Sequence, residues 1–216
     1  MMNSLPLFAD RTDAGRQLAS ALAQRVDHTA VIMALPRGGV PVAAQVAQAV
    51  GAALDVLIVR KLGAPGQPEF GIGAVTGGAV PQVVMNQDAL AWLNPPPGYV
   101  QGEIRRQQDE IARRHAVYIG NRPPVPIAGR TIVVVDDGAA TGGTAQAALR
   151  ALRQGGAGRL LLALPVAAPQ ALALLEQEAD ETVCLHTPEG FRAVGRYYAD
   201  FTQTTDDEVV RLLAQR

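Results

Sequence analysis

The sequence predicts an α/β fold in which helices cover both faces of a parallel sheet. Short, continuous apolar runs alternate with stretches of helical periodicity along most of the chain. Runs that stay apolar at every position are typical of strands buried on both faces, as in a parallel sheet. The length of 216 residues and the hydrophobic content of 48% fit one globular domain, residues 1–216.

The first part of the chain starts this alternation. Leu18, Leu22 and Val26 recur at a spacing of four, which places an apolar stripe on an amphipathic helix. Two apolar runs bounded by turn residues then enclose another stretch of helical periodicity, as in a βαβ unit. The expected order is a helix from near Thr12, a strand at 30–36, a helix at 40–50 and a strand at 54–62.

The pattern changes at residues 63–97, where Gly and Pro are frequent. Two short β-like pieces, at residues 72–75 and 81–86, predict a hairpin within a long excursion. Excursions of this length in compact domains are usually functional or mobile. A long helix is expected next, at residues 100–118, with an arginine-rich solvated face paired with acids such as Asp109.

The second half of the chain resumes the alternation of strands and helices. A connector rich in proline leads into a run of β-branched residues, and two adjacent glycines close the helix that follows. The expected elements are a strand at 131–135, a helix at 144–157, a strand at 159–167, a helix at 169–179 and a strand at 181–186.

Composition and charge exclude several classes of protein. A formal net charge of −1 gives no general attraction to nucleic acid or to anionic membranes, so any polyanion site must be local. One cysteine cannot form an internal disulfide or a cysteine-rich metal cluster. The start of the chain lacks a secretory signal pattern, and no segment reaches about 18 uninterrupted apolar residues. We expect a soluble, cytoplasmic protein.

The stretch TIVVVDDGAATGGT, residues 131–144, joins an apolar strand to two acids and a loop of small residues. In a parallel α/β sheet, ligands bind beyond the carboxyl ends of the strands, which is where Asp136 and Asp137 stand. The loop at residues 138–144 then enters a helix, so its free N–H groups can surround a phosphate. Because the acids would repel that phosphate, they suit the hydroxyls of a neighbouring sugar. The implied ligand is a sugar phosphate.

Two other phosphate-binding motifs do not fit this stretch. A dinucleotide fingerprint needs GxGxxG directly after the strand, and a P-loop needs a Lys that is missing here. The stretch instead resembles the phosphoribosyl diphosphate (PRPP) motif of the type I phosphoribosyltransferases. That resemblance implies a Rossmann-like parallel sheet with helices on both faces, a flexible lid hairpin at about residues 63–97, and a small hood. The hood would consist of about residues 185–216 with the N-terminal segment.

The resemblance also implies roles for individual residues. The acids that match Asp136 and Asp137 hold the ribose hydroxyls, directly or through Mg²⁺, which is the implied cofactor. The stretch LPRGGVP resembles the family's pyrophosphate loop, which presents a side-chain cation and exposed N–H groups to the diphosphate. The implied PRPP-binding residues are Arg37, Gly38, Gly39, Asp136, Asp137, Gly138, Ala139, Ala140, Thr141, Gly142, Gly143 and Thr144.

Two further segments carry implied roles. Arg60 and Lys61 match the basic residues with which the family grips pyrophosphate, and they join the two acids as candidate catalytic residues. Near the end of the chain, TPEGFRAVGRYYADF is similar to the hood of purine phosphoribosyltransferases, in which Phe191 would stack on the base and Asp200 would lie near the metal. The spacings are each one residue longer than in the hypoxanthine-guanine type, so a core aromatic residue and a surface acid stay open as alternatives.

The implied activity is transfer of ribose 5-phosphate from PRPP to a nucleobase-like acceptor with release of pyrophosphate, as in nucleotide salvage. Ala140 stands where enzymes that act on 6-oxopurines usually carry Asp, which disfavours hypoxanthine and guanine. Non-catalytic PRPP sensors share the fold, so a regulatory protein stays open as the alternative, and so does a homodimer. A general nucleotide-binding module would leave the paired acids unexplained.

Overall fold

The computed structural model describes residues 6–77, 81–120 and 122–215 of the chain. The expected single domain, lid and hood therefore each include a few residues that lie outside the described part. Among the described helices, none is both long and apolar enough to cross a membrane.

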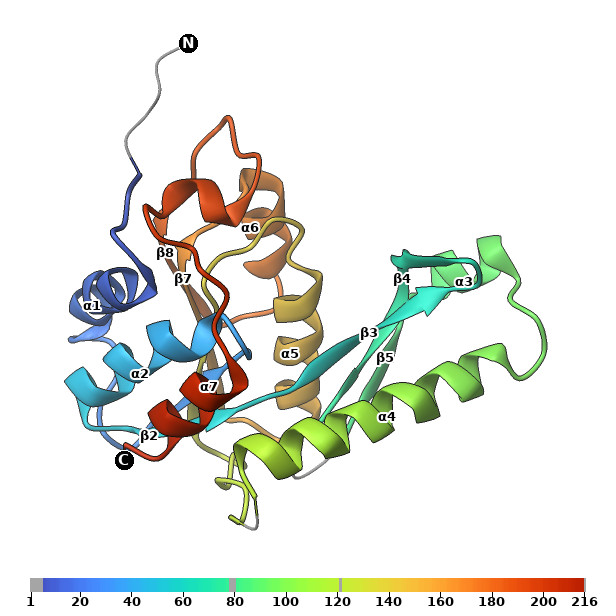
Figure 1. The fold of residues 1–216 in the computed structure, drawn as a ribbon, viewed down its shortest axis with the longest axis horizontal. Coiled ribbons are helices and arrows are strands. Elements are labelled where there is room, and N and C mark those ends of the chain that lie inside the picture. The colour runs from blue at the N-terminus through green and yellow to red at the C-terminus, as the bar shows by residue number, and fades with distance from the viewer. Residues whose placement is uncertain (1–5, 78–80, 121, 216) are drawn as a thin grey trace.

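The centre of the molecule is a five-stranded sheet in which every neighbouring pair is parallel. Its strands are β1 (Val31–Ala34), β2 (Ala53–Val56), β6 (Thr131–Val135), β7 (Arg159–Val166) and β8 (Glu181–His186). Their order across the sheet is β2-β1-β6-β7-β8. Figure 1 shows helices on both sides of this sheet, so the predicted α/β fold is confirmed.

Both faces of the parallel sheet are buried in separate hydrophobic cores. The helices that contribute to them are α1 (Arg11–Leu22), α2 (Gly39–Val50), α5 (Gly143–Gln154) and α6 (Pro169–Leu175). Ile32 of β1 packs in the core of α1 and α2, while its neighbour Val31 packs in the core of α5 and α6. Because successive side chains of a strand point to opposite faces, β1 is apolar throughout and β6 is apolar at every position after Thr131, as the sequence predicts.

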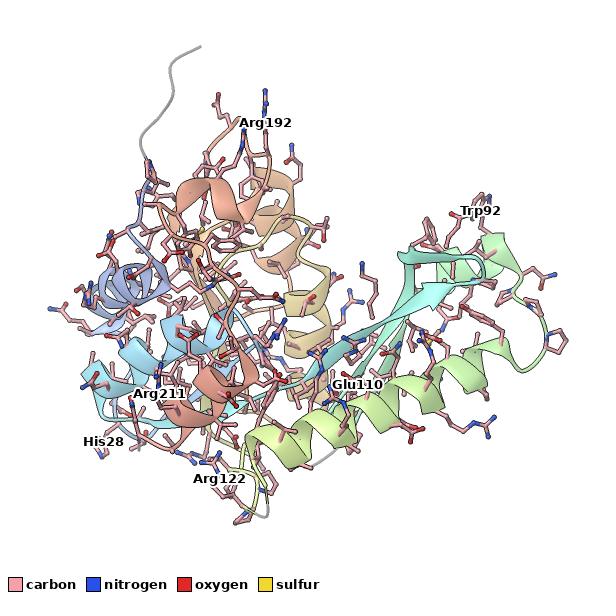
Figure 2. The ribbon with its side chains drawn as sticks, viewed as in Figure 1. His28, Trp92, Glu110, Arg122, Arg192 and Arg211 are labelled. Atoms are coloured by element: carbon pink, nitrogen blue, oxygen red, sulfur yellow. The ribbon has the colours of Figure 1, made fainter. Side chains whose placement is uncertain are left out.

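The excursion after β2 is larger than a hairpin. β3 (Val59–Ala64), β4 (Gln67–Thr76) and β5 (Val83–Met85) form a separate antiparallel sheet, which contains the predicted pairing of β4 with β5. Helices α3 (Gln87–Leu93) and α4 (Tyr99–Tyr118) complete this unit, which we call the arm. Figure 1 shows the arm extending away from the parallel sheet, and Figure 2 places Trp92 at its far end.

The single strand predicted at residues 54–62 is wrong. Its first part is β2 in the parallel sheet, and from Val59 the chain pairs within the arm as β3. Leu57 and Ile58 lie between the two strands, and both side chains are buried. The sequence gives no sign of this change of sheet, because the residues just before and just after the break are all apolar and apolar residues are buried in both sheets.

Helix α4 has the predicted arginine face, but its ion pairs differ from the expected ones. Arg113 and Arg114 both donate hydrogen bonds to Glu110, which is labelled in Figure 2, and these bonds lower the pKa of that carboxyl to about 2. Asp109, which the sequence suggested as a partner, is exposed and takes no part in these pairs. Glu110 and Asp109 lie three and four residues before Arg113, so helical spacing is compatible with either acid as its partner.

The segment before α1 lies against a segment in the last part of the chain. The N–H of Ala199 donates to the carbonyl of Phe8, and the N–H of Asp200 donates to the carbonyl of Ala9, both at 2.8 Å. A short 3₁₀ helix, η1 (Val194–Tyr197), precedes this contact, and helix α7 (Asp206–Leu213) follows it. The start of α1 and the last part of the chain are therefore fixed relative to each other.

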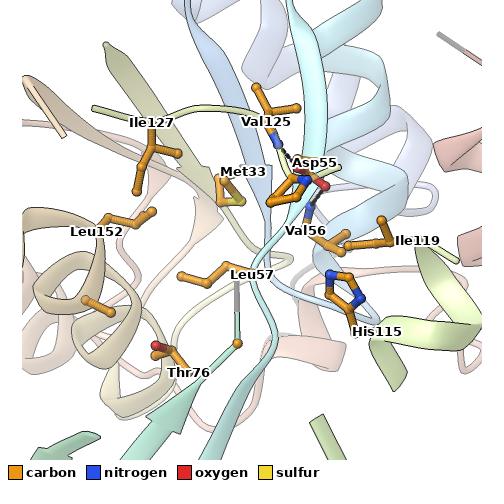
Figure 3. A pocket seen from close by; sticks show the side chains of 13 residues that line it. Met33, Asp55, Val56, Leu57, Thr76, His115, Ile119, Val125, Ile127 and Leu152 are labelled. Carbon is orange, nitrogen blue, oxygen red and sulfur yellow. Dashed lines mark hydrogen bonds between the residues drawn. The ribbon is translucent and has the colours of Figure 1, made fainter. Parts of the chain in front are cut away.

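A buried acid connects β2 to the segment that precedes β6. Asp55 is 3% exposed, and its carboxylate accepts hydrogen bonds from the N–H groups of Val56 and Val125 at 2.9 and 3.0 Å. Figure 3 shows these bonds beside a small cavity that Met33 and His115 also line. The carboxylate satisfies two main-chain donors that would otherwise be buried without partners.

We expect Asp55→Ala to lower the free energy of unfolding by about 1 to 3 kcal/mol, because it leaves two partly buried N–H groups unpaired. Denaturant unfolding measures this change. Asp55→Asn keeps one acceptor oxygen and should cost less, and Asp109→Ala, at an exposed site, serves as the control. An Asp55→Ala protein as stable as the control would contradict this role.

Candidate functional site

The turn after β1 and the acids after β6 lie side by side at the carboxyl edge of the parallel sheet. β1 and β6 are neighbours, and the last residue of one, Ala34, stands opposite the last residue of the other, Val135. Asp136 and Asp137 follow β6 directly. Ligands of open α/β sheets bind at this edge, so the structure brings together two of the segments that the sequence singled out.

Contact between these segments requires the two glycines of the turn. A Cβ atom at Gly38 would lie 2.0 Å from Oδ2 of Asp137, and a Cβ atom at Gly39 would lie 2.9 Å from Cα of Asp136. Both distances are too short for a real side chain, so a larger residue at either position would displace the acids. The glycines therefore allow the first turn of α2 to reach the acid pair.

Asp137 is held by two residues that the sequence did not reveal. Nε of Arg11 donates to Oδ2 of Asp137 at 2.8 Å, and the side chains of this pair are 11% and 15% exposed. The hydroxyl of Tyr198 donates to the main-chain carbonyl of Asp137 at 2.6 Å, and burial raises the pKa of that hydroxyl. One signal was present: a base at the first position of a helix is unusual, because the helix dipole favours acids there.

The surroundings of the acid pair disfavour its negative charge. Burial raises the pKa of Asp136 well above its usual value, and the charge of Asp137 raises it further. Burial also raises the pKa of Asp137, while the guanidinium of Arg11 acts in the opposite direction. Two adjacent carboxyls with raised pKa values cost stability, and such arrangements are concentrated at functional sites.

The loop at residues 138–144 leads into α5 with its first N–H groups uncapped. No side chain caps this helix, and its N-cap residue, Gly142, has a φ of +77°, which glycine adopts readily. Ala139 is buried and its N–H donates to the carbonyl of Val166 at 3.0 Å, which anchors the start of the loop. An exposed helix N-terminus of this kind suits a phosphate. The exposed residues of the loop are Ala140, Thr141, Gly143 and Thr144.

Arg37, in the turn after β1, is paired with an acid at the start of α7. Its Nη1 atom lies 3.7 Å from Oδ1 of Asp206, and both side chains are partly exposed. Tyr118, the last residue of α4, donates its hydroxyl to the same oxygen at 2.6 Å, and burial raises the pKa of that hydroxyl to about 12. Partly exposed ion pairs are weak, so Arg37 can exchange Asp206 for a stronger anion.

Arg60 and Lys61 are adjacent in β3 but have different surroundings. Nε of Arg60 donates to Oε1 of Gln107 on α4 at 2.9 Å, whereas Lys61 is exposed. Lys61 lines a pocket of about 610 Å³ between the arm and α5, and Thr141 and Thr144 line the same pocket. The structure thus brings Lys61 toward the loop before α5 and ties Arg60 to α4.

Phe191 and Asp200 have local partners. The ring of Phe191 is partly buried and packs 5.3 Å from the ring of Tyr197. The carboxylate of Asp200 is exposed and accepts hydrogen bonds from the N–H and the hydroxyl of Thr202. These contacts are compatible with Phe191 as a packed aromatic residue and Asp200 as an acid that stabilises a turn. They are equally compatible with both residues lying at a base site. The base-binding roles therefore stay predictions.

Asp136 and Asp137 are the residues at this edge whose chemistry suits a metal ion. Mg²⁺ prefers oxygen ligands and is usually held by one or two carboxylates together with phosphates of the substrate. Within the described part of the chain, no group of three or more His, Cys, Asp or Glu side chains could hold a metal. The acid pair fits Mg²⁺ shared with a phosphorylated ligand better than a metal caged by the protein alone.

Comparison with known proteins places the chain in a family. The phosphoribosyl transferase domain matches residues 10–201. Two proteins of Mycobacterium tuberculosis, each named "Putative phosphoribosyl transferase", are 46% identical over 209 residues, which is 97% of this chain. The chain spans 47% of their length, so it corresponds to about half of each relative.

Solved structures with a similar fold are also found. The crystal structure of TT1426 from Thermus thermophilus is 44% identical, with 95% of this chain and 97% of that chain covered and a TM-score of 0.83. AQ2163 from Aquifex aeolicus shares the fold at 15% identity, with 88% and 85% covered and a TM-score of 0.52. The matched residues include the glycine turn, the acid pair and the loop before α5. The chain belongs to the phosphoribosyl transferase domain family.

Proposed function

We propose that the protein uses PRPP and Mg²⁺ to transfer ribose 5-phosphate to a nucleobase-like acceptor, with release of pyrophosphate. The observation that carries the proposal is the contact between the glycine turn after β1 and the acid pair after β6, beside the uncapped start of α5. Three kinds of binding group thus occur along one sheet edge. PRPP contains three matching parts: a diphosphate, ribose hydroxyls and a 5-phosphate.

Each part of PRPP has a suitable set of residues. The 5-phosphate suits the free N–H groups at the start of α5 and the hydroxyls of Thr141 and Thr144. The ribose hydroxyls suit the carboxylates of Asp136 and Asp137, which accept hydrogen bonds and would repel a phosphate. The diphosphate suits Arg37 and the N–H of Gly38, since the N–H of Gly39 already donates to the carbonyl of Leu35 at 3.0 Å.

In the proposed reaction, a ring nitrogen of the acceptor bonds to C1′ of PRPP as the bond from C1′ to the diphosphate oxygen breaks. The electron pair leaves with pyrophosphate, and the acceptor nitrogen loses its proton to solvent. Positive charge develops on the ribose and negative charge on the leaving group. Acids beside the ribose and cations beside the diphosphate therefore stabilise the transition state.

The acid pair and the arm supply the remaining requirements. Asp136 and Asp137 would hold Mg²⁺ together with oxygens of PRPP, and the ion would neutralise charge on the leaving diphosphate. Lys61, on the arm, would add a cation when the arm approaches the bound substrate, and that approach would also exclude water. Arg37 would exchange its ion pair with Asp206 for an ion pair with the diphosphate.

The loop before α5 narrows the choice of acceptor. Ala140 is exposed and has no titratable group, and it stands where the resemblance places an Asp in enzymes that act on 6-oxopurines. The loop thus lacks a group that could exchange a proton with such a base. We therefore expect an acceptor other than hypoxanthine or guanine.

A first test combines the protein with PRPP, Mg²⁺ and a panel of nucleobases while pyrophosphate is measured. We expect release that requires PRPP and at least one base of the panel. Binding of PRPP without release over the whole panel would contradict the enzyme and support the PRPP-sensing alternative. A protein that does not bind PRPP would contradict both.

Asp137→Asn should weaken PRPP binding or slow turnover about tenfold or more, equivalent to about 1.4 kcal/mol or more, because it removes a charge beside the ribose. Titration calorimetry with PRPP and Mg²⁺ and the pyrophosphate assay measure the two effects. Asp109→Asn changes an exposed acid on α4 and should leave both values unchanged. A variant at position 137 with the wild-type affinity and rate would count against the proposed site.

Lys61→Ala should slow the chemical step more than it weakens PRPP binding, because Lys61 reaches the leaving group only when the arm is closed. The expected loss in the single-turnover rate is about tenfold, against a smaller change in affinity. Lys61→Arg keeps the positive charge and should retain part of the rate. A wild-type single-turnover rate in Lys61→Ala would overturn this role.

A further inference from the structure

We infer that Arg11 is a positioning residue of the site: it holds one oxygen of the Asp137 carboxylate and leaves the other for the ribose of PRPP. This inference rests on the proposed function and adds a residue from outside the four segments that the sequence singled out. Arg11 would act on the substrate through Asp137 and would not touch PRPP itself.

The geometry at Asp137 divides its two carboxylate oxygens. Oδ2 accepts the Nε–H of Arg11 at 2.8 Å and faces the backbone of Gly38, where an added Cβ would lie 2.0 Å away. Among the described residues, Arg11 is the one whose side chain donates a hydrogen bond to this carboxylate, and it donates to Oδ2. A ligand hydroxyl at the sheet edge would therefore meet Oδ1, with the carboxylate plane fixed by Arg11.

Arg11 is itself fixed by three contacts. Besides its bond to Asp137, its Nη1 donates to the carbonyl of Thr202 at 2.8 Å, and its guanidinium carbon lies 3.9 Å from the centre of the Phe201 ring. Cation–π contacts of this kind are strongest where the cation is shielded from water, and only 11% of the Arg11 side chain is exposed. A guanidinium held in this way acts as a rigid support for the carboxylate.

The supporting contacts come from the start of α1 and from a segment in the last part of the chain. Arg11 begins α1, while Thr202 and Phe201 follow the segment that bonds to Phe8 and Ala9. Tyr198, in the same segment, holds the main-chain carbonyl of Asp137. The side chain and the backbone of Asp137 are thus both fixed from this junction, although β6, the strand that Asp137 follows, lies in the middle of the sheet.

The positive charge of Arg11 also serves the binding of a polyanion. Asp136 and Asp137 together would repel the phosphates of PRPP, and each would raise the energy of the other. Arg11 offsets one of these two charges from the side of the carboxylate that faces away from Oδ1. Loss of Arg11 would leave the pair both less ordered and more repulsive to the substrate.

The experiment measures PRPP affinity with Mg²⁺ by calorimetry in Arg11→Ala, Arg11→Lys, Asp137→Asn and the double variant Arg11→Ala/Asp137→Asn. The control is Arg16→Ala, because Arg16 lies on the same helix with its side chain 62% exposed. We expect Arg11→Ala to weaken PRPP binding about fivefold or more and Arg11→Lys to recover part of the loss. Arg16→Ala should bind as the wild type does.

The double variant separates positioning from a general structural role. If Arg11 acts through Asp137, adding Arg11→Ala to Asp137→Asn should weaken binding no further, whereas independent effects would multiply. Guanidinium ion added to Arg11→Ala should also restore part of the affinity. Two results would overturn the inference. One is a double variant whose loss of PRPP affinity equals the product of the two single losses. The other is PRPP binding that is unchanged or tighter in both Arg11→Ala and Arg11→Lys. A wild-type protein that does not bind PRPP would instead overturn the proposed function.

Discussion

The site depends on one close contact, the approach of the Gly38–Gly39 turn to the carboxylates at the end of β6. Parallel pairing of β1 with β6 ends both strands at the same level, so the segments that follow them must share one edge of the sheet. Only glycine leaves room there, since a Cβ atom at either position would overlap Asp136 or Asp137. The contact places the turn that carries Arg37 and Gly38 beside two acids, and a ligand with both phosphates and hydroxyls can satisfy such a pair.

Residues far from the sheet edge in sequence hold the parts of this contact in place. Arg11 and Tyr198, from the two ends of the chain, fix Asp137, and Asp206 at the start of α7 pairs with Arg37. The same acid accepts a hydrogen bond from Tyr118 at the end of α4, so the arm and the glycine turn share a partner. A ligand that draws Arg37 away from Asp206 would therefore also change the surroundings of the root of the arm.

The fold could be predicted, and a candidate site could be located, because their signals are local. Strands buried on both faces are apolar at every position, and two acids followed by a small-residue loop stand together in the sequence. The break between β2 and β3 has no local signal, because a change of sheet alters the pairing partner and leaves the apolar run intact. Arg11 and Asp55 act through contacts with residues distant in the chain, which neither spacing nor composition records.

We expect PRPP to bind at the edge shared by β1 and β6, and a crystal structure of the protein with PRPP and Mg²⁺ would show where it lies. The expected electron density has the 5-phosphate at the N–H groups that begin α5 and the ribose hydroxyls within hydrogen-bond distance of Asp136 and Asp137. The diphosphate should lie against the Gly38–Gly39 turn. Density for PRPP elsewhere, or with its ribose turned away from both acids, would rule out this binding site.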